Sequence, residues 1–107
     1  MLHPYFSARL PAIRAVCQAH GVNKLYAFGS IVDGRFIEGK SDIDLFVELR
    51  TNSPEIKART LLLLWIDLQR ILNCDVDLLT SKCIRGKYFQ KYLKLYKVLV
   101  FDYEVAR

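Results

Sequence analysis

The segment 42–49 (DIDLFVEL) constrains the fold more than any other part of the chain, because it opens with acidic and apolar side chains in strict alternation. Alternation with a period of two is typical of a strand that has one buried face. Ile43 and Leu45 therefore point into a core. Asp42 and Asp44 project together from the opposite face. A strand of this kind has to be covered on its apolar side by other elements of the chain.

Short strands and amphipathic helices alternate along the rest of the chain. The residue pattern predicts strands at 24–28, 42–49 and 74–80, with 97–101 as an optional fourth, and helices at 5–19, 54–72 and 82–95. Ser53 is expected to cap the second helix, and Pro54 fits its first position. This order predicts an α+β fold, an α/β sandwich in which a small mixed sheet of three to five strands is covered by helices.

The length of 107 residues predicts one domain over 1–107, since a chain of this size buries a single modest core. Its longest apolar run, 61–66, is too short to cross a membrane, and its N-terminus lacks the apolar stretch of a signal peptide. The cysteines, Cys17, Cys74 and Cys83, do not have the spacing of a zinc site or a disulfide framework. We therefore expect a cytoplasmic protein without membrane contact.

The positive charge of the chain is concentrated near its C-terminus. The net charge is +5, yet residues 1–81 contain nine basic and nine acidic side chains, whereas residues 82–107 contain seven basic and two acidic ones. This asymmetry favours contact with a polyanion or an acidic partner. A solvated basic helix face explains it equally well.

Aromatic residues are interleaved with this charge. Within 82–97, a stripe of tyrosines lies beside a stripe of lysines, namely Tyr88, Tyr92 and Tyr96 beside Lys87, Lys91 and Lys94. Charge and base stacking together make nucleic acid a candidate partner for residues 82–97. The interpretation that we favour is that the tyrosines pack on the sheet while the lysines face water.

The predicted helix at 54–72 carries more apolar residues than one core face needs. Leu62, Leu63 and Ile66 widen its apolar arc beyond the stripe that faces the core. We favour deeper burial of this helix as the explanation. The alternative is a docking surface for a partner.

Acidic residues on two predicted strands suggest a metal site. Asp42 and Asp44 share one face with their Cα atoms about 6.5–7 Å apart, and two anions this close repel each other unless a cation lies between them. Asp77 joins them as a third ligand if its strand pairs with the strand at 42–49. Asp75 is the alternative third ligand. We favour Asp77, because its apolar neighbours indicate a paired strand. Ligation by oxygen alone selects Mg²⁺ or Mn²⁺ over zinc.

Gly29 and Ser30 follow the apolar segment 24–28 and precede the acidic pair by a short loop. Glycine lets a phosphate chain approach the backbone, and a serine hydroxyl can donate a hydrogen bond to phosphate oxygens. A phosphate-binding turn beside a carboxylate-held metal is what nucleotidyl transfer requires. Taken alone, Gly29-Ser30 is equally an ordinary turn between a strand and a helix.

Three motifs together resemble a known superfamily. LYAFGS (25–30), SDIDLFV (41–47) and VDLLT (76–80) are similar to the motifs of the DNA polymerase beta-type nucleotidyltransferases. The size of the chain is similar to that of the minimal nucleotidyltransferases, which are often encoded beside a HEPN-domain partner in prokaryotic toxin–antitoxin pairs. The resemblance covers about residues 20–100 and implies the polymerase-beta-type nucleotidyltransferase fold.

The resemblance also implies a reaction and a set of site residues. Gly29 and Ser30 would bind nucleotide phosphates, and Asp42, Asp44 and Asp77 would bind two Mg²⁺ ions, with Mn²⁺ as an alternative. Asp77 would also help to activate the acceptor hydroxyl. The implied activity transfers AMP from ATP to a hydroxyl, such as a tyrosine of the HEPN-type partner toxin. The chain would then be the antitoxin of the pair, and a homo-oligomer is a further option.

One departure from the family pattern concerns the residues after Gly-Ser. Small members commonly have arginines there, whereas this chain has Ile31, Val32 and Asp33. We expect Arg35, Lys40 and Ser41 of the same loop to complete the nucleotide site, with help from lysines of the last helix. The departure keeps two alternatives open. One is a weak or inactive transferase-like protein that neutralises its partner by complex formation, and the other is a small nucleic-acid-binding domain.

Overall fold

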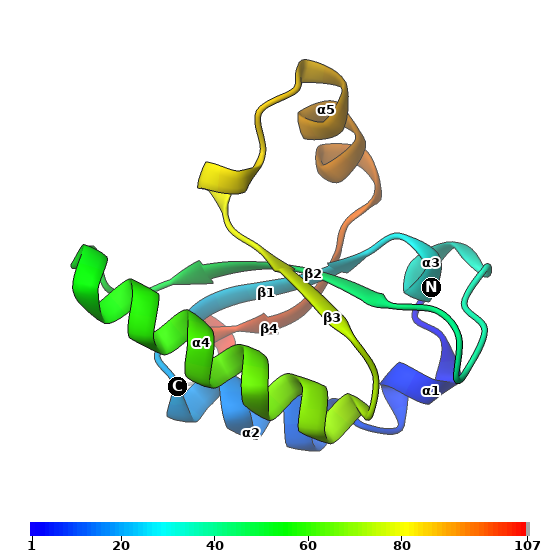
Figure 1. The fold of residues 1–107 in the computed structure, drawn as a ribbon, viewed down its shortest axis with the longest axis horizontal. Helices are drawn as coiled ribbons and strands as arrows, with labels where there is room; N and C mark the ends of the chain where they lie inside the picture. Colours follow the sequence, from blue (N-terminus) through cyan, green and yellow to red (C-terminus); the bar gives the residue numbers. More distant parts are fainter. Residues whose placement is uncertain (107) are drawn as a thin grey trace.

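The computed structural model describes residues 1–106 and contains a four-stranded mixed sheet with the order β3-β2-β1-β4 (Figure 1). The strands are β1 (Val22–Phe28), β2 (Ile43–Leu49), β3 (Val76–Leu79) and β4 (Val98–Asp102). β1 is antiparallel to β2 and β4, whereas β2 and β3 run parallel. The predicted α+β fold with a small mixed sheet is confirmed, including the optional last strand.

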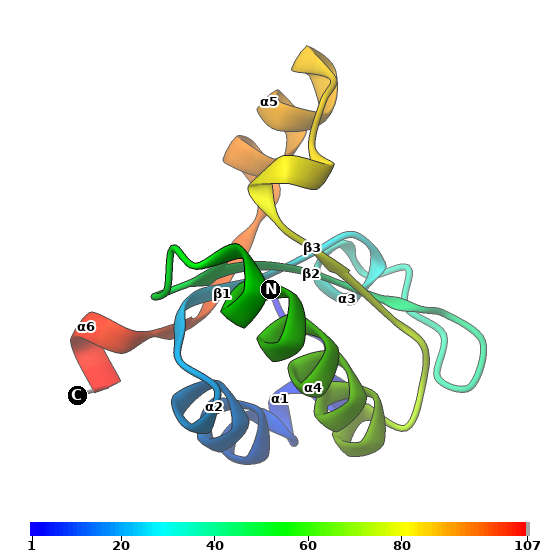
Figure 2. The same ribbon diagram turned by 60° about the vertical axis from the view of Figure 1, so that its left-hand side comes forward.

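Three helices cover one face of the sheet: α1 (Pro4–Ser7), α2 (Leu10–Ala19) and α4 (Pro54–Leu72) (Figures 1 and 2). The main core lies between them and the alternate residues of the strands, so that Ile43, Leu45 and Val47 of β2 are buried there. The single helix predicted at 5–19 is wrong in one respect, because it is divided before Leu10. Pro11 cannot donate a backbone hydrogen bond and therefore occupies the first turn of a new helix.

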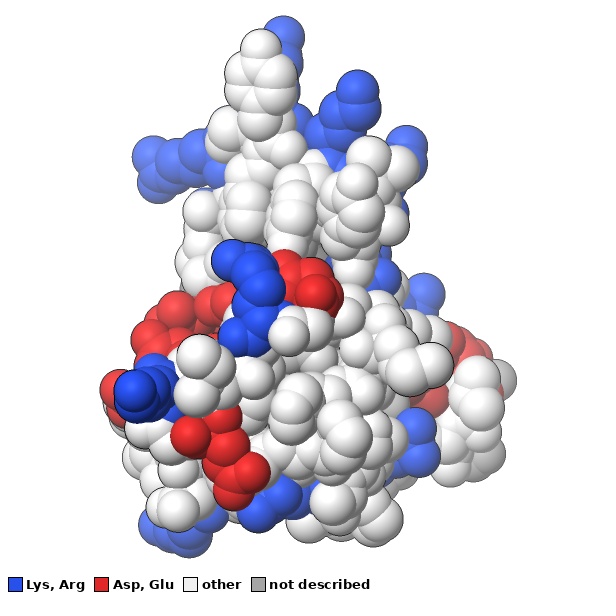
Figure 3. All heavy atoms as spheres, turned by 90° about the vertical axis from the view of Figure 1, so that its right-hand side faces the viewer, with Lys and Arg blue, Asp and Glu red and all other residues white. Residues whose placement is uncertain are grey.

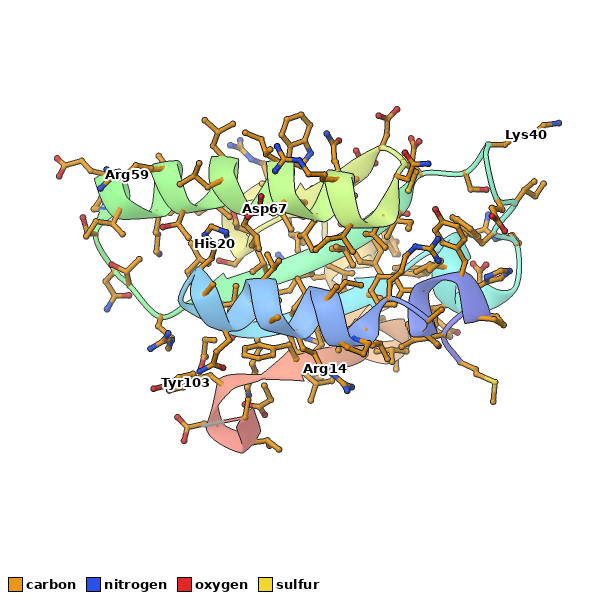
Figure 4. The ribbon with its side chains drawn as sticks, turned by 90° about the horizontal axis from the view of Figure 1, so that it is seen from below. Arg14, His20, Lys40, Arg59, Asp67 and Tyr103 are labelled. Atoms are coloured by element: carbon orange, nitrogen blue, oxygen red, sulfur yellow. The ribbon has the colours of Figure 1, made fainter. Side chains whose placement is uncertain are left out.

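α4 is capped at its N-terminus and is tied to the end of α2. The Ser53 hydroxyl oxygen accepts a hydrogen bond from the Ile56 N–H (3.4 Å), as the predicted N-cap requires. Where α2 ends, His20 points toward Asp67 of α4, with 2.7 Å between Nε2 and Oδ2 (Figure 4). The contact between His20 and Asp67 holds α4 beside α2.

The outer side of α4 remains exposed. Leu62, Leu63 and Ile66 are 56%, 46% and 36% exposed. The favoured expectation of deeper burial is therefore wrong, because the described chain places no further layer over this helix. Within residues 1–106, no helix has the length and apolar character that a membrane span requires.

Within the described residues, the opposite face of the sheet carries only η1 (Ser81–Cys83) and α5 (Lys87–Tyr96). α5 stands upright from the sheet (Figures 1 and 2). The sequence predicts one helix over 82–95, but Gly86 separates the two helical segments. A second, smaller core forms beneath α5 from buried Phe28, Phe46 and Leu93. The short α3 (Ser30–Asp33) and α6 (Tyr103–Ala106) follow β1 and β4.

The expectation that all three tyrosines of α5 pack on the sheet is wrong for two of them. Tyr88 is 92% exposed and Tyr96 is 58% exposed. Tyr92 alone joins the smaller core, since the helix turns Leu93 toward the sheet and leaves the tyrosine stripe on its flank. α5 therefore presents aromatic and basic side chains to solvent.

Candidate functional site

A cleft of about 500 Å³ opens where the sheet meets the foot of α5. Its lining comes from β1, the loop after α3, β2, β3 and α5, and consists of Phe28, Gly29, Arg35, Asp44, Asp77, Leu79, Phe89 and Tyr92. Acidic and basic side chains gather together at the foot of the upright helix (Figure 3). The cleft thus joins a charged half to an aromatic and aliphatic half.

Asp44 and Asp77 form the acidic centre of this cleft. They are directly opposite each other in the parallel pairing of β2 with β3. Period-two alternation turns both side chains away from the main core, while Ile43, Val76 and Leu78 face it. The residue pattern therefore brings two carboxylates to one point of the sheet, on the face that carries η1 and α5.

The environment of Asp44 disfavours its negative charge. The pKa of the Asp44 carboxyl is raised from 3.8 to about 6. Burial is the largest cause, followed by a hydrogen bond with Asp77 and by the charges of Asp77 and Asp42, and Arg35 opposes these effects. A cation placed between the carboxylates would relieve this repulsion.

The third predicted ligand lies at the edge of the pair. Asp42 directly precedes β2 and is exposed, and its charge reaches Asp44. Among residues 1–106, no three His, Cys, Asp or Glu side chains converge closely enough to form a ready metal cluster. The donor set of carboxylate oxygens nevertheless fits Mg²⁺ or Mn²⁺, and Asp42 would have to turn inward to complete it. Asp75 is exposed, and its backbone oxygen accepts a hydrogen bond from the Ile43 N–H (3.0 Å).

Gly29 faces the acidic pair from the end of β1. Its φ of +74° lies in the region that favours glycine. A Cβ atom at this position would meet the Asp44 carboxylate well inside the 3.0 Å that real Cβ atoms keep. The Asp44 carboxylate therefore packs directly on the Gly29 backbone, which is possible only because this residue carries no side chain. Ser30 is half-buried at the start of α3 and does not line the cleft.

Arg35 is the cation that the loop after α3 brings to the cleft. Its Nε and Nη2 donate to the same Asp33 oxygen, at 2.9 and 2.6 Å. This guanidinium holds the pKa of Asp33 below its ordinary value, and it also interacts with Asp44 and Tyr92. Arg35 therefore offsets Asp33, which stands where the resemblance led us to expect arginines.

Two other predicted residues of this loop lie elsewhere. Lys40 points away from the molecule at the tip of the loop (Figure 4). The Ser41 hydroxyl oxygen accepts a hydrogen bond from the Ile37 N–H (2.9 Å) and thereby closes the loop. Neither side chain lines the cleft.

The aromatic half of the cleft was not predicted. Phe89 and Tyr92 have nearly parallel rings, with an interplanar angle of 9° and centroids 6.1 Å apart. Phe28 meets Phe89 edge-on at 5.9 Å. The three-residue spacing of Phe89 and Tyr92 placed them on one helix face, but only the docking of α5 shows that this face borders the carboxylates.

Comparisons with known proteins identify the family and the fold of the chain. Residues 12–100 match the nucleotidyltransferase domain family. No functionally curated protein shows significant sequence similarity to the chain. Several solved structures share the fold, at sequence identities below 25%.

Three of these structures are informative. A toxin–antitoxin structure with AMP-PNP has a TM-score of 0.67 and 19% identity, over 91% of this chain and 76% of that one. A candidate minimal nucleotidyltransferase has a TM-score of 0.62 and 24% identity, over 87% and 90% of the two chains. The complex of a tri-AMPylated Shewanella oneidensis HEPN toxin with its MNT antitoxin has a TM-score of 0.60 and 17% identity, over 94% and 75%. The polymerase-beta-type nucleotidyltransferase fold expected from the sequence is thereby confirmed.

Proposed function

Because the chain belongs to the nucleotidyltransferase domain family, we propose that it transfers AMP from ATP to a hydroxyl of a partner protein in a Mg²⁺-dependent reaction. The observation that carries this proposal is the pair Asp44 and Asp77 in one cleft, with the Asp44 carboxylate directly against the bare backbone of Gly29. A triphosphate can approach at Gly29, and carboxylates that repel each other are suited to a divalent ion.

The residues of the cleft have distinct roles in this proposal. Asp44 and Asp77, with Asp42 turned inward, would hold Mg²⁺, which neutralises phosphate charge when bound. Arg35 offers its guanidinium to the phosphate chain. Ser30 at the start of α3, and Lys40 and Ser41 after loop movement, would extend this contact.

Asp77 is the more exposed acid of the pair and accepts the proton of the acceptor hydroxyl. The hydroxyl oxygen forms a bond to the α-phosphorus, and the bond from that phosphorus to pyrophosphate breaks. The proton ends on the Asp77 carboxylate and pyrophosphate leaves. The products are an AMP ester of the acceptor and free pyrophosphate.

The acceptor that we propose is a tyrosine of a HEPN-domain toxin, with this chain as the antitoxin in the cytoplasm. The support is the fold shared with toxin–antitoxin structures, one of which contains an AMPylated HEPN toxin. The exposed apolar side of α4 and the exposed aromatic residues of α5 are surfaces that such a partner can contact.

The test uses ATP labelled at its α-phosphate, Mg²⁺ and the protein encoded by the neighbouring gene. We expect covalent labelling of that protein with the wild type, none with Asp44→Asn, and normal labelling with Asp75→Asn. Asp75 is the matched control, because it is an exposed aspartate of the same region that does not line the cleft. Equal labelling by the wild type and Asp44→Asn would refute the catalytic assignment.

A second function is neutralisation by complex formation alone. It is favoured by the absence of a ready three-residue metal cluster within residues 1–106 and by the replacement of the usual arginines. The Asp44→Asn variant separates the two functions in cells. Survival of cells that carry the toxin and Asp44→Asn would support binding alone, whereas loss of protection with an intact complex would support transfer.

A further inference from the structure

We propose that the aromatic half of the cleft, formed by Phe89 and Tyr92, is the platform on which the nucleobase stacks, and that it favours purine over pyrimidine nucleotides. This inference rests on the proposed function, since it requires that the charged half of the cleft takes a triphosphate. It adds the part of the site that recognises the rest of the nucleotide.

The two halves of the cleft adjoin in a way that suits one ligand. Phe28 directly precedes Gly29, and its ring meets Phe89 at 5.9 Å. The platform therefore begins beside the turn that approaches the carboxylates, with no other element between them. The cleft volume of about 500 Å³ is that of a typical small-molecule site.

The platform has the geometry that stacking requires. The rings of Phe89 and Tyr92 are tilted by only 9° and present nearly parallel faces. Buried Phe28 supports Phe89 edge-on from the sheet, while Phe89 and Tyr92 themselves are only half-buried. A flat base that stacks on these rings can therefore bury aromatic surface that is otherwise exposed to solvent.

A ligand made of phosphate alone would use only half of this cleft. Gly29, Arg35 and the carboxylates provide for charge, but the aromatic rings offer nothing to a bare polyphosphate. Stacking on an aromatic side chain stabilises any base, and the larger purine ring system covers more of the platform. Arg35, whose charge interacts with Tyr92, lies where the two halves meet.

The experiment measures the affinity of ATP, CTP and inorganic tripolyphosphate in the presence of Mg²⁺ by titration calorimetry. We expect the wild type to bind ATP more tightly than CTP. Phe89→Ala should weaken ATP binding by about fivefold or more, as the loss of one stacking contact predicts, and leave tripolyphosphate binding unchanged. Tyr88→Ala is the matched control, because Tyr88 adjoins Phe89 in the same helix but is 92% exposed and does not line the cleft.

Phe89→Leu repeats the test with apolar packing retained, in case the alanine variant does not fold. The platform is overturned if Phe89→Leu binds ATP as the wild type does, or if it loses ATP and tripolyphosphate equally. A wild type that binds tripolyphosphate as tightly as ATP also overturns it while leaving the charged half intact. A wild type that binds neither ligand overturns the proposed function itself, and the platform with it.

Discussion

The replacement Asp44→Asn should stabilise the protein at neutral pH in the absence of metal. The folded structure holds the Asp44 carboxyl half-buried opposite Asp77, with a pKa of about 6 instead of 3.8. A carboxyl whose folded pKa exceeds its unfolded value binds its proton more tightly in the folded state. The wild type therefore gains stability as the pH falls through 6 toward 4, and the destabilisation is fully present above about pH 7.

The size of this effect follows from the pKa difference. That difference corresponds to at most about 3 kcal/mol in the free energy of unfolding, and solvent screening at a half-exposed group lowers it to about 1–2 kcal/mol. In a chain of this length the melting temperature of Asp44→Asn should exceed that of the wild type by roughly 5–10 °C at pH 7.5. The difference should shrink toward pH 5, where the wild-type carboxyl is protonated.

Thermal unfolding followed by circular dichroism between pH 5 and 7.5, without Mg²⁺, measures this effect. Asp75→Asn serves as the control and should change stability by less than about 0.5 kcal/mol, because Asp75 is an exposed acid outside the cleft. Added Mg²⁺ should raise the melting temperature of the wild type and not that of Asp44→Asn. If Asp44→Asn melts at the wild-type temperature at pH 7.5 and has the same pH dependence, the electrostatic reasoning is refuted.

Three other substitutions test separate parts of the structure. Gly29→Ala should lower the free energy of unfolding by about 1–3 kcal/mol in urea. Gly39→Ala should cost less, because Gly39 also has a positive φ but an added Cβ there would meet no atom within 4 Å. Equal costs would refute the close approach of Gly29 to Asp44. Arg35→Gln should weaken ATP binding about tenfold in calorimetry. Arg59→Gln, which removes the same charge from the exposed side of α4 outside the cleft, should leave it unchanged. Trp65→Phe should lower the free energy of unfolding by about 1 kcal/mol, because the Trp65 Nε1–H donates to the Val76 carbonyl oxygen (2.8 Å). An unchanged melting temperature in thermal unfolding would count against that hydrogen bond.

The charged half of the site could be predicted where it depends on local geometry. Alternation at 42–49 placed Ile43 in the core and Asp44 on the opposite face, because the direction of successive side chains in a strand does not depend on distant residues. The position of Asp77 opposite Asp44 needed one more condition, the parallel pairing of β2 with β3. That pairing joins segments that are distant in the sequence, so the residue pattern alone could not predict that it forms.

The other features of the site and the fold depend on how the helices and loops pack against the sheet. Helical spacing identified the stripe of Tyr92 and its neighbours, but a period of 3.6 does not say which side of α5 meets the sheet. The sequence also did not determine where the side chains of the loop point. Arg35 and Lys40 are cations of one loop, yet Arg35 turns toward Asp33 and the cleft whereas Lys40 turns outward. Burial of α4 could not be judged, because it depends on whether a further layer covers it.

The hydrogen bonds between α4 and β3 bear on the tendency of the protein to aggregate. β3 is an edge strand, and an open edge is a template for the strands of other molecules. Trp65 donates to the carbonyl oxygen of Val76, and the Gln69 side-chain oxygen accepts from the Val76 N–H at 3.3 Å. Both backbone groups through which a foreign strand would join at Val76 are thus already occupied by the chain's own helix, which hinders the pairing of a foreign strand at this residue.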